Sequence, residues 1–192
     1  MLGRGCASPE ETNLREITIA SRRLYEGRIV NLRVDTVRLE DGRITEREIV
    51  EHRGAVAVVA LDEGDNVLLV RQFRKPAERE LLEIPAGTLE VGEEPASCAR
   101  RELAEETGYR AGHLEPIGGF YSSPGFCTEY IYLYLATDLS PSRARPEYDE
   151  AIELIRVPFS EALKMIGRGE IHDAKTMVGL LSAWARRQGL FG

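Results

Sequence analysis

Short alternating runs of apolar and polar residues dominate the first third of the chain, and they predict strands rather than helices. Between Glu16 and His52 three such runs follow one another, and an Asp41-Gly42 pair between the last two is typical of a hairpin turn. The next run, AVAVVAL at residues 55–61, is continuously apolar, which suits a strand buried on both faces. This part therefore predicts three antiparallel strands followed by a core strand.

The remaining two thirds alternate between strand and helix patterns. A turn at Asp62–Asp65 leads into a further strand at residues 66–74, and we expect a short extended segment at 81–86. Further strands are predicted at residues 112–121, 129–139 and 150–158. The mixture of strands with a few helices indicates an α/β sandwich.

Three helices are predicted from their end signals. Pro95 suits the first residue of a helix and Gly108 suits its end. Ser160 and Asp173 are expected to cap two further helices, the last of which runs to about Arg187.

The first predicted helix carries an unusual row of acids. Glu102, Glu105 and Glu106 stand at relative positions 0, +3 and +4, so their carboxylates share one arc of the helix. Like charges at this spacing repel by a few tenths of a kcal/mol per pair, so a helix selected only for stability would avoid them. Hard oxygen ligands of this kind are what Mg²⁺ prefers. The pattern therefore predicts a divalent-metal site, with a plain exposed acidic helix as the alternative.

Composition narrows the class of protein. The 192 residues fit one domain with a small appended element, and 43% hydrophobic residues suffice for a core. A net charge of −7 with no basic stretch argues against a nucleic-acid partner.

The apolar run at 55–61 is too short to span a bilayer. Residues 1–14 lack the apolar core of a secretory signal, so we expect a disordered leader there. Three cysteines without a CxxC pair indicate free thiols in a reducing cytoplasm.

The segment from Gly87 to Tyr109 resembles the Nudix box, the signature of the Nudix hydrolases. The family pattern is Gly, five residues, Glu, seven residues, Arg-Glu, an aliphatic residue, any residue, Glu-Glu, any residue, Gly, and an aliphatic residue. Only the final position departs from it, because Tyr109 stands where Ile, Leu or Val is usual. The matching residues are Gly87, Glu93, Arg101, Glu102, Leu103, Glu105, Glu106 and Gly108.

The flanking motifs resemble those of the ADP-ribose pyrophosphatase branch of this superfamily. RQFR at 71–74, EIPAG at 83–87 and YSSPG at 121–125 surround the box, and Pro124 stands sixteen residues beyond Gly108, as a proline does in that branch. The resemblance covers roughly residues 16–187. It implies a Nudix α/β/α sandwich with a mixed sheet, preceded by a small N-terminal antiparallel sheet, and it implies hydrolysis of ADP-ribose to AMP and ribose 5-phosphate.

The resemblance also implies roles for individual residues. The Ala86 carbonyl, Glu102 and Glu106 would ligate two or more Mg²⁺ ions, or Mn²⁺ in their place, and Glu105 would join them directly or through water. Arg101 and Glu93 would form a buried pair that orients the helix, while Pro85 fixes the preceding backbone and Gly87 lets it turn.

Phosphate binding is expected from the strand-end arginines before the box. Arg71 and Arg74 would hold phosphate, with Glu83 behind them; the alternative for either arginine is a salt bridge with Glu80 or Glu83.

The resemblance further implies that the N-terminal strands and one loop complete the site. Residues 15–54 would pair two copies of the chain, and Tyr25 and Arg28 are candidates for contacts with the base, with plain packing as the alternative for Tyr25. Residues 55–192 would form the hydrolase domain. The general base would come from the loop before the last strand, where Glu150 is preferred over Glu147, unless this loop is acidic only for solubility.

Two other functions stay open at this point. The base and sugar are read by residues that no motif fixes, so the substrate is ADP-ribose or another nucleoside diphosphate sugar such as GDP-mannose. A catalytically silent nucleotide sensor is the second alternative. Sensors can lose their ligand glutamates, whereas this chain keeps Glu102, Glu105 and Glu106.

Overall fold

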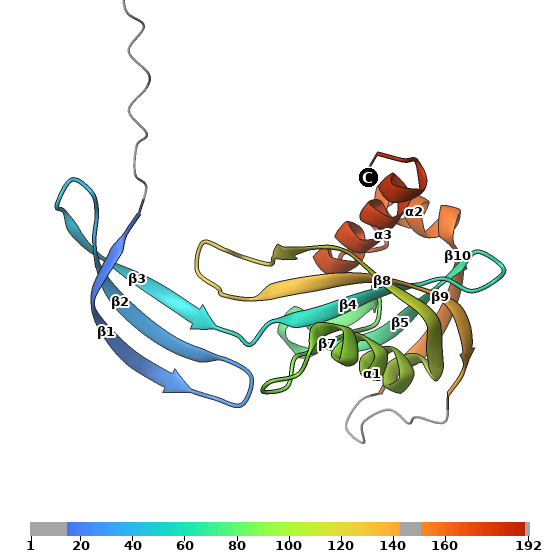
Figure 1. Cartoon of the computed structure of the whole chain (residues 1–192), viewed down its shortest axis with the longest axis horizontal. Coiled ribbons are helices and arrows are strands. Elements are labelled where there is room, and N and C mark those ends of the chain that lie inside the picture. Colours follow the sequence, from blue (N-terminus) through green and yellow to red (C-terminus); the bar gives the residue numbers. More distant parts are fainter. Residues whose placement is uncertain (1–14, 143–150, 191–192) are drawn as a thin grey trace, which may run out of the picture. The chain divides into compact units, whose positions relative to one another are not determined.

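The computed structural model describes residues 15–142 and 151–190. The described part of the chain forms two compact units, which meet between residues 51 and 52 of the sequence (Figure 1). In the described residues no helix is long and apolar enough to cross a membrane.

The N-terminal unit is the three-stranded antiparallel sheet that the sequence predicts. Its strands are β1 (Ile17–Glu26), β2 (Asn31–Arg38) and β3 (Ile44–Glu51), and they lie side by side in that order. The hairpin between β2 and β3 turns at Gly42, whose φ of 84° favours glycine. The Asp41 carboxylate accepts a hydrogen bond from the Arg43 backbone N–H at 3.0 Å, which fixes the turn.

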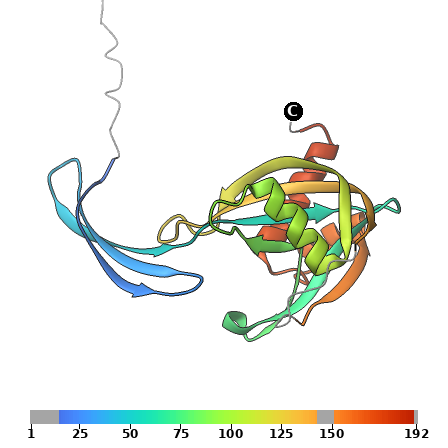
Figure 2. The same ribbon diagram turned by 60° about the horizontal axis from the view of Figure 1, so that its bottom comes forward.

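The second unit is built on two sheets. One has the order β10-β5-β6 and the other the order β7-β4-β9-β8. Strands β4 and β9 run parallel whereas their other neighbours are antiparallel, so the larger sheet is mixed, as expected (Figure 2). The strands are β4 (Ala55–Ala60), β5 (Asn66–Arg74), β6 (Arg79–Glu83), β7 (Ala86–Thr88), β8 (Tyr109–Tyr121), β9 (Tyr130–Pro141) and β10 (Glu153–Pro158).

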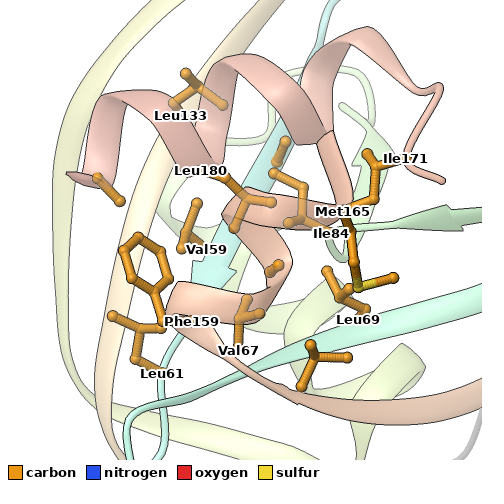
Figure 3. Close-up of a cluster of buried hydrophobic side chains, with 14 of the residues drawn as sticks. Val59, Leu61, Val67, Leu69, Ile84, Leu133, Phe159, Met165, Ile171 and Leu180 are labelled. Atoms are coloured by element: carbon orange, nitrogen blue, oxygen red, sulfur yellow. The ribbon is translucent and has the colours of Figure 1, made fainter. Parts of the chain in front are cut away.

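Strand β4 is buried on both faces, as its unbroken apolar sequence predicts. Val56 and Val58 pack with buried residues of α1 (Pro95–Thr107), and Val59 packs on the opposite face with Leu180 of α3 (Ala174–Arg187). The cluster that contains Val59 and Leu180 also includes Phe159 of α2 (Phe159–Gly167) (Figure 3). Helices therefore cover both sides of this sheet, and the unit is an α/β/α sandwich.

Two local predictions differ from the structure. Ser160 does not cap α2, because the helix already begins at Phe159 and Pro158 stands at its N-cap without a side-chain hydrogen bond. The expected single segment at 81–86 is also two strands. β6 ends at Glu83 in one sheet and β7 begins at Ala86 in the other, so the chain crosses between sheets at Ile84 and Pro85. The cap at Asp173 is confirmed, since its carboxylate accepts the Thr176 N–H at 2.9 Å.

Candidate active site

Helix α1 has the limits that its sequence predicts, and its packing fixes which side faces away from the core. It begins at Pro95 and ends at Gly108, which adopts a left-handed φ of 73° and donates its N–H to the Ala104 carbonyl. Cys98 and Leu103 are fully buried against the sheet. The helix therefore holds its row of three glutamates in a fixed orientation beside β7.

Two of these carboxylates contact the backbone of β7. The Glu106 side chain is 7% exposed and accepts a hydrogen bond from the Ala86 N–H at 3.0 Å. The Glu102 carboxylate lies directly against Gly87, so a β-carbon built there would overlap it. Gly87 has no left-handed φ, so the expectation that it allows a turn is wrong. A side chain at position 87 would push the Glu102 carboxylate from the place it occupies here.

Arg101 donates hydrogen bonds to three acidic residues of the box, Glu93, Glu102 and Glu105. Its guanidinium donates two hydrogen bonds to Glu93, each at 3.0 Å, and one of its terminal nitrogens contacts Glu102 at 2.7 Å and Glu105 at 3.1 Å. The hydrogen bonds from Arg101 lower the pKa of Glu93 to about 2. The Arg101 and Glu93 side chains are 28% and 15% exposed, so the expected pair is present and partly buried.

Both strand-end arginines lie in ion pairs. Arg74 forms a fork with Glu83 at 2.8 and 2.6 Å, and Arg71 contacts Glu153 at 3.0 Å on the surface. Glu83 is 1% exposed and also contacts Lys175 of α3. Burial alone would raise the pKa of Glu83, but hydrogen bonds and charges from Arg74 and Lys175 outweigh burial and lower it. Of the two alternatives for Arg74, this geometry favours the salt bridge with Glu83.

The residues around β7 fit a divalent ion by their donor chemistry. Glu102 and Glu106 bring carboxylate oxygens up to the Ala86–Gly87 backbone, and Glu105 lies on the same helix face, within hydrogen-bonding distance of Arg101. Oxygen donors of this kind suit Mg²⁺ and Mn²⁺. In residues 15–142 and 151–190, however, no three acidic, histidine or cysteine side chains are already gathered tightly enough to hold a metal. A bound ion would therefore draw these carboxylates together.

The other predicted site residues lie on other elements or outside the described part. Glu147 and Glu150 fall within 143–150, which the structure does not describe. Pro124 is exposed in the loop between β8 and β9. Tyr25 and Arg28 are exposed in the N-terminal unit, and the Tyr25 ring also packs over Gly27, so contact with a base and packing both remain compatible with its position.

One cluster beside the site was missed by sequence reasoning. Lys175 and Thr176 at the start of α3 bond to Glu83 and Ile84, just before Ala86, and Asp173 bonds to both of these α3 residues. The only available signal was a lysine and a threonine directly behind a predicted helix cap. That signal is weak, because residues at a helix start are usually solvated.

An α/β/α sandwich whose helix presents a carboxylate row to a neighbouring strand is the architecture of the Nudix class. The fold of the chain matches that of a crystal structure titled "ADP compounds hydrolase", with a TM-score of 0.81 over 93% of this chain and 99% of that one, at 20% identity. The NUDIX domain model matches residues 51–178, and the model of the nucleoside diphosphate sugar hydrolase N-terminal domain matches residues 16–50. The chain therefore belongs to the Nudix family.

Several curated relatives are similar over most of their length. An ADP-ribose pyrophosphatase of Bacillus subtilis is 46% identical over 85% of this chain and 90% of its own. A methanol dehydrogenase activator of Bacillus methanolicus is 44% identical over 86% of this chain and 90% of its own. A GDP-mannose pyrophosphatase of Cronobacter sakazakii is 38% identical over 77% of this chain and 83% of its own.

Proposed function

We propose that this protein hydrolyses the pyrophosphate bond of ADP-ribose and releases AMP and ribose 5-phosphate. The observation that carries the proposal is that the carboxylates of Glu106 and Glu102 both lie against the Ala86–Gly87 backbone. The similarity to an ADP-ribose pyrophosphatase, at 46% identity over 85% of the chain, supports this substrate over others. GDP-mannose is the main alternative, because a GDP-mannose pyrophosphatase is 38% identical.

The metal ligands in this proposal are the Ala86 carbonyl, Glu102 and Glu106, with Glu105 joining directly or through water. Two or more bound Mg²⁺ ions, or Mn²⁺ in their place, would neutralise the phosphoryl oxygens and activate a water. The protein's own part is to hold the carboxylates in place. Arg101 donates hydrogen bonds to Glu102 and Glu105, and the Ala86 N–H donates one to Glu106. Glu150, or Glu147 in its place, would take the proton from the water.

The phosphates would be held near the end of β5. Arg71 is partly exposed and its ion pair with Glu153 is on the surface, so a phosphate can displace the carboxylate at little cost. Arg74 is held more firmly by Glu83, and we assign it the role of a fixed positive charge beside the site. Pro124 would contribute to substrate binding, as its spacing from Gly108 implies.

The N-terminal unit would pair two copies of the chain and contact the base through Tyr25 and Arg28. All ten residues of β1 are exposed in the single chain, and several are large and apolar. Ile17, Ile44 and Tyr25 are each about 60% exposed, which is unusual for a sheet of three strands. A second copy would cover this surface. A cytoplasmic location is part of the proposal, since Cys98 and Cys127 are free thiols.

The substrate is tested by incubating the purified protein with ADP-ribose, GDP-mannose and diadenosine polyphosphates. Product release is measured in a phosphatase-coupled assay with Mg²⁺, with Mn²⁺ and with excess EDTA. We expect the highest kcat/KM for ADP-ribose, AMP and ribose 5-phosphate in equal amounts, and no turnover in EDTA. Preference for GDP-mannose would favour the alternative substrate. Nucleotide binding without turnover of any substrate would favour a sensor.

The assembly is tested by light scattering coupled to gel filtration. We expect about twice the chain mass of 21.4 kDa at micromolar concentration. Replacing Ile17 and Ile44 by Glu should shift the protein to the monomer mass, whereas the same change at the exposed Leu181 of α3 should not. A wild-type monomer with full activity would refute the dimer.

A further inference from the structure

The segment that carries Ala86 has an unusual backbone environment. Glu83 closes β6 and Ala86 opens β7, so Ile84 and Pro85 cross between two sheets and lie outside both ladders. The Pro85 carbonyl is bound by the Val58 N–H at 2.8 Å. The Ile84 N–H has no strand partner; it donates instead to the Thr176 hydroxyl at 2.9 Å.

Thr176 is well suited to hold this N–H. Its side chain is fully buried, and its hydroxyl donates its single proton to the Asp173 carboxylate at 2.5 Å. The oxygen is thereby left as an acceptor for the Ile84 N–H. Asp173 in turn is fixed as the N-cap of α3 through the Thr176 N–H. Loss of the hydroxyl would leave a buried N–H without a partner, which the chain can relieve only by moving.

Lys175 makes a second link between α3 and the same segment. Its ammonium contacts Glu83 and lies 3.0 Å from an Asp173 carboxylate oxygen, and its side chain is 14% exposed. Glu83 itself is almost fully buried. Two successive residues, Glu83 and Ile84, are therefore tied to the first turn of one helix by two different kinds of bond.

The helix also approaches this segment closely. Gly179 lies one turn beyond Thr176, and a β-carbon there would stand 2.7 Å from the Ile84 side chain. Figure 3 shows Ile84 among the core side chains near Leu180 of α3. Helix α3 therefore packs directly against Ile84, and Ala86, the first residue of β7, follows two residues later in the chain.

We propose that Thr176 and Lys175 are positioning residues for the metal site. They touch neither the ion nor the substrate. They hold Glu83 and Ile84, and so set where the Ala86 carbonyl and the Ala86 N–H that binds Glu106 can lie. This inference rests on the proposed function, because it takes Ala86 and Glu106 to be part of that site. Partners behind metal ligands commonly change metal affinity by about 10- to 100-fold.

The test measures Mn²⁺ binding to the protein alone, by electron paramagnetic resonance, with no substrate present. Thr176→Val removes the hydroxyl and keeps the shape of the side chain, and we expect it to weaken Mn²⁺ affinity about 10-fold. Thr176→Ser keeps the hydroxyl and should restore the wild-type affinity. Lys175→Met should also weaken binding, and it decides the question if Thr176→Val does not fold.

Two matched controls separate positioning from general destabilisation. Thr128→Val also removes a hydroxyl that accepts a backbone N–H, that of His52 at 2.9 Å, but away from the Ala86 segment. Lys164→Met removes an exposed lysine of α2. Both should bind Mn²⁺ as the wild type does, and melting curves recorded without metal would show that each variant is folded.

The outcomes distinguish this inference from the proposed function. If the wild type binds Mn²⁺, Glu106→Gln weakens binding, and folded Thr176→Val and Lys175→Met bind normally, the positioning role is overturned and the metal site stands. If the wild type binds no Mn²⁺, or Glu106→Gln binds as tightly as the wild type, the metal site and the positioning role fall together. If both α3 variants weaken binding and the serine variant restores it, the positioning role is supported.

Discussion

Arg101→Ala should destabilise the protein far more than the loss of a surface arginine. Its guanidinium bonds to Glu93 twice and reaches Glu102 and Glu105 as well. The alanine variant would leave these three partly buried carboxylates close together without their shared cation. Because removal of one partner of a buried pair leaves an uncompensated charge, the free energy of unfolding should fall.

The size of the effect follows from the Glu93 carboxylate. Its pKa falls from an ordinary 4.5 to about 2, largely through hydrogen bonds from Arg101. At about 1.4 kcal/mol per pH unit, this corresponds to at most about 3.5 kcal/mol. Solvent screening makes the loss in free energy of unfolding smaller than this, because Arg101 is 28% exposed. Repulsion among the three acids that remain makes the loss larger. We therefore expect a loss of about 2–3 kcal/mol, or about 4–12 °C in melting temperature.

The assay is thermal and urea unfolding at pH 7 without divalent ions, followed by circular dichroism. Arg100→Ala is the matched control, because Arg100 is the exposed neighbour and bonds only to the Ala111 carbonyl at 3.3 Å in the contacts described. The control should melt close to the wild type. A melting temperature for Arg101→Ala that matches this control would refute the reasoning.

The same pair of proteins has a predictable pH dependence. Because the pKa of Glu93 is lowered in the folded state, its contribution to stability is complete above about pH 4.5 and is lost as the pH falls towards about 2. The stability difference between wild type and Arg101→Ala should therefore narrow over this window. A difference that stays constant from pH 6 to pH 3 would show that Glu93 is not the main partner.

Three further changes test the site. Gly87→Ala should displace the Glu102 carboxylate and lower kcat by about 10²-fold with little change in melting temperature; normal turnover would show that Glu102 has room to adjust. Glu106→Gln should remove most turnover and leave the melting temperature near that of the wild type, since it removes one charge from a repelling row; unfolding would show a structural role instead. Glu150→Gln should lower kcat by about 10²–10⁴-fold with unchanged Mn²⁺ affinity, and a loss seen only in Glu147→Gln would move the general base to that residue.

Helix α1 is an element that the local sequence predicts well. Pro95 and Gly108 set its ends, and the spacing of Glu102, Glu105 and Glu106 sets their shared face, because both depend on helix geometry alone. The buried strand at Ala55–Ala60 and the hairpin at Gly42 were predictable for the same reason. Each of these signals lies within a few residues of the structure it determines.

Contacts between segments that are distant in the sequence could be identified only in the tertiary structure. The reason for glycine at position 87 lies in a carboxylate fifteen residues away, and sequence reasoning assigned it wrongly to a turn. The pairing of Arg74 was open between phosphate and carboxylate until the fold brought Glu83 beside it from the neighbouring strand.

Local patterns in the sequence were enough to identify the helix that carries the acids, most of the strands and the family that these motifs define. Tertiary structure decided how the acids are held, because that depends on which elements meet. The crossing of Ile84 and Pro85 between two sheets leaves an N–H that only a third element can bind, and α3 supplies Thr176 from 92 residues away. No sequence pattern predicts such a contact, because a hydroxyl at a helix start can bond equally well to water or to a buried N–H.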